Sequence, residues 1–170
     1  MKTTILLFVF SLTLASAFAQ EVNTLSEAQI SFVFTSKDVK GTLSGFSSTS
    51  TVDLNNLTNS KFKGSVKAET IDSGNFLRNW SLKGSKYFDA ENYPELSFES
   101  TSVTENQTGF AVKGTLTIKG TSKPVTIDFK KNGDQLIGTT TIYSSDFGIT
   151  IIKKSKEANA VKVTLAFKVN

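Results

Sequence analysis

The sequence predicts an all-β fold made of antiparallel strands. Three observations support this prediction: apolar and polar residues alternate over most of the chain, turn signals separate the alternating runs, and the pattern contains no βαβ units. The alternation is clear in one run of inward-phase residues, Phe110, Val112, Gly114, Leu116 and Ile118. Alternation of this kind is typical of strands that bury one face and expose the other to water. A β-sandwich or a β-barrel is therefore expected.

The strands are expected to follow one another along the chain with short connections. Seven or eight are predicted near residues 28–36, 39–46, 49–54, 61–70, 95–104, 109–119, 122–131 and 135–143, with a last strand near 160–169. Asn132-Gly133 is a strong signal for a two-residue hairpin between two of these runs. No internal repeat or linker interrupts them, so a single domain is expected.

One segment of the chain does not alternate. Ser73 or Asn75 can cap a short helix, and Gly84 can end it. Pro94 favours an extended residue before it and so marks the beginning of the next strand. The sequence therefore predicts a short helical insertion near residues 74–83. Its apolar residues are expected to plug or gate one end of the barrel, together with a following aromatic residue: Phe76, Trp80, Leu82 and Phe88.

Residues 1–19 fit the pattern of a secretory signal peptide. Lys2 supplies a positive charge, residues 5–14 form a mainly apolar run, and Ala17-Phe18-Ala19 matches a small-x-small cleavage site. The apolar run is too short to cross a bilayer comfortably. We therefore expect cleavage after Ala19, a single mature domain over residues 20–170, and a periplasmic or secreted location.

The chain contains no Cys and no His, which restricts its chemistry. A Ser-His-Asp triad, a Cys nucleophile and a His- or Cys-ligated metal site cannot be built. Asp89, Glu91 and Glu95 are the remaining acid–base candidates, since glycoside hydrolysis uses paired carboxylates. Carboxylates beside a turn are usually solvated, however. We therefore expect no enzymatic activity, no metal and no cofactor.

The charge of the chain is mildly basic, with a formal net charge of +4. The lysines are scattered, and the densest cluster is small: Lys153, Lys154 and Lys156. Nucleic-acid binding would require a basic stripe or a recognisable motif, so it is not expected. A weak attraction to anionic membrane surfaces stays open.

Several glycines share the apolar phase of the predicted strands: Gly41, Gly45, Gly64, Gly114 and Gly138. They have two interpretations. They can be kinks and bulges that let a sheet curl, or small inward residues that leave a tunnel beside inward phenylalanines. Both interpretations favour a curled, closed sheet.

Three ordered motifs and one shorter match resemble the YceI-like family. The central motif is WSLKGSKYFD at residues 80–89, followed by Tyr93-Pro94 and by Leu96-Ser97-Phe98. The second is GTLTIKGTSKPV at residues 114–125, and the third is Ser145-Asp146-Phe147-Gly148. Near the start, Val39-Lys40-Gly41 leading to Gly45-Phe46 is also similar to the family. Together the matches span about residues 25–169.

This resemblance implies an eight-stranded, lipocalin-like antiparallel barrel with an apolar tunnel. It also implies that the tunnel binds a long isoprenoid or another lipid chain, without established enzymatic activity, and export to the periplasm is common in the family. The chain departs from the family pattern at two positions. The family often has His before the Leu of the central motif, and this chain has Ser81; the family often has Arg before S-D-F-G, and this chain has Ser144. A quinone head group is therefore not inferred.

The first hypothesis is an exported binding protein that sequesters or carries a long apolar ligand. Its predicted ligand-binding residues are Phe32, Phe34, Leu43, Phe62, Val66, Phe76, Trp80, Leu82, Phe88, Phe98, Phe110, Val112, Leu116, Ile127, Phe129, Val163, Leu165 and Phe167. The second is an enzyme that uses carboxylates on a lipid or sugar. The third is a filled barrel that serves as a stress or redox accessory through its surface. The sequence leaves the oligomeric state and the ligand head group open.

Overall fold

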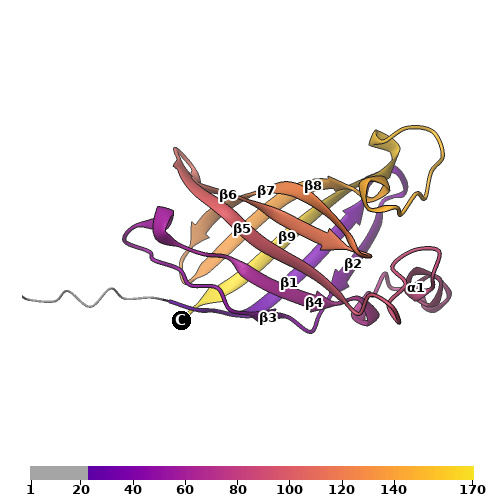
Figure 1. Cartoon of the computed structure of the whole chain (residues 1–170), viewed down its shortest axis with the longest axis horizontal. Coiled ribbons are helices and arrows are strands. Elements are labelled where there is room, and N and C mark those ends of the chain that lie inside the picture. The colour runs from indigo at the N-terminus through magenta and orange to yellow at the C-terminus, as the bar shows by residue number, and fades with distance from the viewer. Residues whose placement is uncertain (1–22) are drawn as a thin grey trace, which may run out of the picture.

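The computed structural model describes residues 23–170 as a curled antiparallel sheet with a short helix at one end (Figure 1). The predicted signal peptide lies outside the described residues. The strands are β1 (Leu25–Phe34), β2 (Val39–Leu43), β3 (Ser47–Ser48), β4 (Lys63–Lys67), β5 (Glu95–Asn106), β6 (Gly109–Ile118), β7 (Thr121–Asn132), β8 (Gln135–Tyr143) and β9 (Ala160–Val169). The helix is α1 (Phe76–Lys83), and short 3-10 turns are η1 (Thr35–Lys37), η2 (Leu57–Asn59), η3 (Ala68–Thr70), η4 (Ser144–Phe147) and η5 (Glu157–Asn159).

The strand order across the sheet is β2-β1-β9-β8-β7-β6-β5-β4-β3. Neighbours from β3 to β9 follow the chain, whereas β1 lies beside β9, so that the first and last strands pair near one side of the sheet. The sheet curls until its ends meet. Thr42 of β2 exchanges two backbone hydrogen bonds with Asp72, at 2.8 and 3.1 Å, and the Lys67 N–H donates to the Ser44 carbonyl at 3.1 Å.

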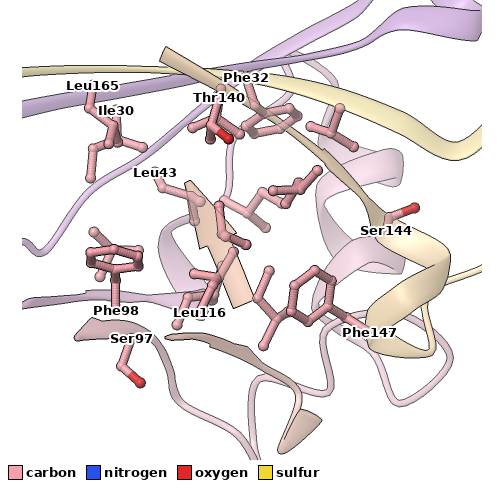
Figure 2. Close-up of a pocket in the computed structure, with 18 of the residues that line it drawn as sticks. Ile30, Phe32, Leu43, Ser97, Phe98, Leu116, Thr140, Ser144, Phe147 and Leu165 are labelled. Carbon is pink, nitrogen blue, oxygen red and sulfur yellow. The ribbon is translucent and has the colours of Figure 1, made fainter. Parts of the chain in front are cut away.

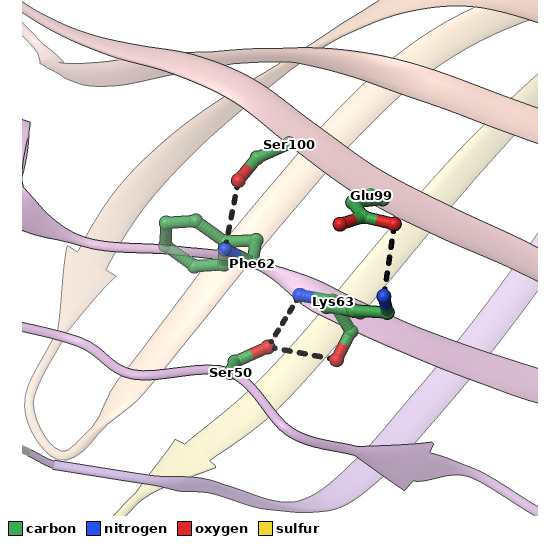
Figure 3. Close-up of polar contacts among 5 residues, drawn as sticks. All are labelled: Ser50, Phe62, Lys63, Glu99 and Ser100. Carbon is green, nitrogen blue, oxygen red and sulfur yellow. Dashed lines mark hydrogen bonds and ion pairs between the residues drawn. The ribbon is translucent and has the colours of Figure 1, made fainter.

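The expected barrel-like all-β fold is confirmed, but the strand count differs from eight, since nine strands form. The predicted strand at residues 49–54 is reduced to isolated bridges, and β3 is only two residues long. The cause is local. Only a few backbone hydrogen bonds, such as the pair between Thr51 and Lys61, join this segment to the chain before β4, and the Ser50 hydroxyl adds two more to Lys63 (Figure 3).

The hydroxyls of Ser50 and Ser100, which we call the serine seam, hold Phe62 and Lys63 where β4 begins. The Phe62 N–H donates to Ser100 Oγ at 2.9 Å (Figure 3), and the Ser100 N–H donates to the Phe62 carbonyl at 2.8 Å. Ser50 Oγ accepts from the Lys63 N–H at 2.9 Å and donates to the Lys63 carbonyl at 3.2 Å. The nearby ion pair between Lys63 and Glu99 spans 3.0 Å, but both side chains are more than half exposed, so it contributes only about 0–1 kcal/mol.

Phenylalanine rings fill the end of the barrel opposite α1. Phe62, Phe110 and Phe129 stack on one another with ring centroids 5.9, 5.4 and 5.3 Å apart. Phe167 adjoins Phe129 at 6.2 Å and Phe46 at 5.0 Å. All of these except Phe46 are buried. Stacked aromatic pairs add about 0.5–1.5 kcal/mol each beyond their area burial, so this end of the interior is a solid core.

At two inward glycines, an aromatic ring of the neighbouring strand packs directly against the glycine backbone. Gly41 lies opposite Phe32, and a Cβ on Gly41 would come within 2.3 Å of Phe32 Cζ. Gly138 lies opposite Phe129, and its Cβ would come within 2.5 Å of the Phe129 ring. Each ring therefore occupies the volume that a side chain on the glycine would take. Gly45 differs, since its φ of +69° marks it as a turn residue.

We predict that Gly114→Ala destabilises the protein by about 1–3 kcal/mol, because overpacking forces rings and backbone to move. A Cβ at Gly114 would lie 2.4 Å from both the Phe98 ring and the Glu99 carbonyl. Gly84→Ala is the matched control, since its Cβ would meet only the Ser81 carbonyl at 3.3 Å, and we expect a change within about 0.5 kcal/mol. Urea unfolding measures both. Equal stability of the two variants would contradict this role of Gly114.

Candidate functional site

An apolar cavity of about 470 Å³ lies inside the barrel, on the α1 side of the stacked rings. Four of the rings at this end, Phe46, Phe62, Phe129 and Phe167, border the cavity, and the three buried ones, Phe62, Phe129 and Phe167, form what we call the phenylalanine floor. Figure 2 shows side chains from several strands around one space, including Ile30, Phe98 and others, with Phe147 of η4 on one side. The volume falls within the range of about 300–1,000 Å³ that is usual for small-molecule sites.

Most of the predicted ligand-binding residues border this cavity. They are Phe32, Phe34, Leu43, Phe62, Val66, Leu82, Phe88, Phe98, Leu116, Ile127, Phe129, Val163, Leu165 and Phe167. The strands bring them together because alternate residues of a strand point to the same face. Their contact with a ligand stays a prediction.

Four of the predicted residues lie elsewhere. Phe110 and Val112 are 2% and 0% exposed and belong to the core on the far side of the floor, so the Phe62 and Phe129 rings separate them from the cavity. Phe76 and Trp80 are 80% and 74% exposed, on the outer face of α1. The expectation that these two residues plug the barrel end is therefore corrected, since α1 directs other residues toward the cavity.

Sequence reasoning missed several residues that border the cavity. Ile30 shares the phase of Phe32 and Phe34 on β1, so the same alternation includes it. Phe147, Ile149 and Ile151 also border the cavity, and the first two are 2% exposed. These three apolar residues alternate in the sequence as the residues of a strand do, but they lie in a turn and the loop after it.

Two of the hydroxyl side chains on the cavity wall, those of Thr140 and Ser144, donate to protein carbonyls. Thr140 Oγ1 donates to the Thr126 carbonyl at 2.8 Å, and Ser144 Oγ donates to the Ile149 carbonyl at 2.7 Å. In Figure 2 the Ser144 hydroxyl points away from the enclosed space. Because these hydroxyls already have partners, the wall presents mainly carbon to the interior.

The charged residues that border the cavity are all cationic: Lys37, Lys63 and Arg78. Lys63 is paired with Glu99. Within residues 23–170, Lys37 and Arg78 have no ion pair, and both lie at the α1 end, where Ser81 also borders the cavity. We call the positions of Lys37, Arg78 and Ser81 the mouth.

The carboxylates that were the acid–base candidates lie outside the cavity. Asp89, Glu91 and Glu95 are absent from the residues that line it. Asp89 accepts two hydrogen bonds from the Asn92 side chain, at 3.0 and 3.2 Å, while Glu91 and Glu95 are exposed. No carboxylate pair therefore faces the enclosed space in the described part of the chain.

Hydrogen bonds at its N-terminal end fix α1 beside the mouth. Asn75 caps the helix by accepting from the Arg78 N–H at 3.0 Å. Asp72 Oδ1 accepts from the Gly74 N–H and from the Asn79 side-chain amide, each at 2.8 Å. These hydrogen bonds, the Gly74 one first, lower the pKa of Asp72 below its ordinary value of 3.8.

A buried asparagine organises the loop on the other side of the mouth. Asn159 is 1% exposed, and its side chain accepts from the Ile151 and Ile152 N–H groups at 2.8 and 3.0 Å. It also donates to the carbonyls of Ile152 and Ser155, at 2.8 and 3.0 Å. Because all of its polar capacity is used, Asn159 holds Ile151 against the cavity without leaving an unpaired polar group.

The described residues offer neither a metal cluster nor a spanning helix. Across residues 23–170, no three His, Cys, Asp or Glu side chains gather closely enough to hold a metal ion. In the same part of the chain, no helix is both long and apolar enough to cross a membrane.

The described residues thus form a barrel-like antiparallel sheet around an apolar cavity. The YceI-like domain family matches residues 21–169, and the chain belongs to this family. A UPF0312 protein of Yersinia pestis (strain Pestoides F) is 31% identical over 93 residues, which cover 55% of this chain and 48% of that protein. A UPF0312 protein of Photorhabdus laumondii is 32% identical over 94 residues, covering 55% and 49%. The chain spans about half the length of the curated relatives it matches.

Solved structures share the fold. BcnA of Burkholderia cenocepacia superposes with a TM-score of 0.72 at 23% identity, covering 84% of this chain and 96% of that one. The YCEI protein of Campylobacter jejuni has a TM-score of 0.65 at 20% identity, covering 78% and 85%. A polyisoprenoid binding domain from Saccharophagus degradans has a TM-score of 0.54 at 11% identity, covering 88% and 97%. At these identities the likeness establishes the fold.

We predict that the anchoring of α1 depends on pH only in the acid range. A lowered pKa in the folded state means that the Asp72 contribution is present above its ordinary value of 3.8 and is lost as the pH falls through the lowered value. Asp72→Ala removes both hydrogen bonds, so we expect faster amide hydrogen exchange over residues 73–83 at neutral pH.

Glu105→Ala, an exposed carboxylate at the far end of β5, is the control and should leave this exchange unchanged. As the pH falls below the Asp72 pKa, the unsubstituted protein should approach the Asp72→Ala variant. Indistinguishable exchange of the two proteins at neutral pH would show that Asp72 does not anchor α1.

Proposed function

We propose that this chain binds a long apolar ligand, a polyisoprenoid or another lipid chain, inside the barrel and serves its sequestration or transport as an exported protein. The observation that carries the proposal is the cavity of about 470 Å³, which has a mainly carbon wall and ends on the phenylalanine floor. The name of the Saccharophagus degradans neighbour, a polyisoprenoid binding domain, supports the same class of ligand. Export rests on the pattern of residues 1–19.

The energy for such binding would come from removing hydrocarbon from water. Each buried CH₂ contributes about 0.8 kcal/mol, so a chain of several isoprene units can bind tightly without a specific polar contact. The wall recognises the width and length of the chain and little else. Selectivity between ligands of similar width is therefore expected to be loose.

The mouth selects the charge of the ligand head group. Lys37 and Arg78 belong to it, and no carboxylate among residues 23–170 lines the cavity. A neutral or anionic head group is therefore favoured, whereas a cationic head group would meet like charges. Ser81 at the mouth replaces the His that is frequent in the family, so a head group that depends on an imidazole is not proposed.

The two other hypotheses have less support. An enzyme that uses carboxylates would need them in the cavity, and the candidates Asp89, Glu91 and Glu95 lie outside it. A barrel filled throughout would leave no room for a ligand, whereas here the filling stops at the phenylalanine floor. Binding without catalysis is therefore the function that the geometry favours.

Organic extraction of the purified protein followed by mass spectrometry tests the proposal. We expect a long-chain lipid in a stoichiometric amount, because release of an apolar chain from an apolar cavity would expose its hydrocarbon to water. Protein purified from its native host that yields no lipid, in repeated preparations, would contradict the proposal and favour the interaction protein.

We predict that Leu116→Trp blocks the cavity. The Leu116 side chain points into the enclosed space (Figure 2), so an indole there would displace several methylene groups of a ligand. Affinity for geranylgeraniol, measured by native mass spectrometry, should fall about tenfold or more. Thr115→Trp is the control, since this neighbouring residue lies on the exposed face of β6. Equal affinity of both folded variants would show that the ligand binds elsewhere.

A further inference from the structure

Helix α1 leaves a compact apolar face exposed. Among residues 23–170 the exposed large hydrophobic side chains are Phe76, Leu77, Trp80 and Tyr93, at 80%, 73%, 74% and 38%. The first three lie within one turn of α1, because Phe76 and Trp80 are four residues apart and Leu77 and Trp80 are three apart. We call these three residues the apolar face of α1. Exposed apolar clusters of this kind mark interaction sites.

The opposite side of the same helix belongs to the cavity. Arg78, Ser81 and Leu82 are spaced three and four residues apart on α1, and all three border the cavity. The helix therefore separates the ligand space from its own exposed apolar face by one helix diameter, about 10 Å. In Figure 1, α1 stands at one end of the barrel, apart from the strands.

The surroundings of the apolar face carry a net positive charge. Residues 73–88 contain Arg78, Lys83 and Lys86 and no Asp or Glu, and the flanking Asp72 and Asp89 accept hydrogen bonds from Asn79 and Asn92. Lys119 joins them, because its Nζ donates to the Ser85 carbonyl at 2.7 Å. Aromatic and aliphatic residues flanked by basic residues are typical of helices that lie in the headgroup region of a bilayer.

We propose that the apolar face of α1 docks on the surface of a bilayer that contains anionic lipid. Phe76, Leu77 and Trp80 insert at the boundary between headgroups and acyl chains, and the cations contact lipid phosphates. The mouth then lies at the membrane surface, and an apolar ligand can pass between bilayer and cavity with little exposure to water. This transfer rests on the proposed function, but docking does not.

A second copy of the chain fits this face less well than a membrane. A stable interface buries about 800 Å² on each partner, and three side chains on a helix of two turns provide much less. Two copies that met through this face would also bring their cations together, which disfavours association. An anionic surface complements the same charges, and its attraction weakens as salt screens it.

The chain carries its own reporter for this test, because Trp80 is its only tryptophan. Purified protein is titrated with vesicles of phosphatidylcholine and phosphatidylglycerol, and with vesicles of phosphatidylcholine alone. We expect a blue shift of Trp80 emission and flotation with the anionic vesicles. The apparent affinity for vesicles should fall about tenfold or more when salt is raised or when the anionic lipid is left out.

Two double variants separate the apolar and the charged contributions. Phe76→Ser with Leu77→Ser should abolish the blue shift while leaving thermal stability unchanged, because neither side chain is buried. Lys83→Gln with Lys86→Gln should weaken vesicle binding about tenfold or more. Lys130→Gln with Lys131→Gln removes the same charge from exposed sites on β7 and should leave binding unchanged.

Several outcomes would overturn the docking proposal. These are no binding to anionic vesicles, equal binding by the Phe76→Ser/Leu77→Ser variant, or an equal loss from both lysine pairs. Concentration-dependent dimers that this variant abolishes, without vesicle binding, would assign the face to a second copy. Organic extraction distinguishes the two proposals: vesicle binding by protein that yields no lipid supports docking and contradicts the proposed function.

Discussion

The interior of this barrel depends on aromatic rings that lie against glycines of neighbouring strands. Phe32 on Gly41 and Phe129 on Gly138 are cross-strand pairs in which the ring takes the place of the missing side chain. Such pairing lets a sheet curl tightly without leaving voids at the glycines. At Gly41 the Phe32 ring borders the cavity, whereas at Gly138 the Phe129 ring packs into the phenylalanine floor. The same kind of cross-strand pair therefore serves both the cavity wall and the filled end of the barrel.

The phenylalanine floor divides the interior into two parts with different physical roles. Beyond it, Phe110, Val112 and their neighbours form a buried core whose packing stabilises the fold. On its near side the same kind of residue lines a space that a ligand can occupy. The serine seam at Ser50 and Ser100 fixes Phe62 in the floor, so hydrogen bonds on the wall determine where the core ends.

Much of the fold and of the cavity wall could be predicted from the sequence, because the alternation of apolar and polar residues indicates which face of a strand points inward. Alternation does not state the depth along the barrel, and for this reason Phe110 and Val112 were expected in the cavity. The helix was predicted, but its apolar stripe was assumed to face inward. A helix of two turns can instead be anchored through polar residues, here Asp72 and Asn79, and leave Trp80 in solvent.

The pairing of β1 with β9 has a consequence for how the protein acquires its structure. These strands lie more than a hundred residues apart in the sequence, yet β9 joins β1 to β8. The sheet therefore cannot close until the end of the domain has been synthesised, and contacts of such long range slow folding. Until then β1 and β8 each present an unpaired edge, a template for wrong pairing. A nascent chain of this topology would benefit from being held unfolded until β9 is available.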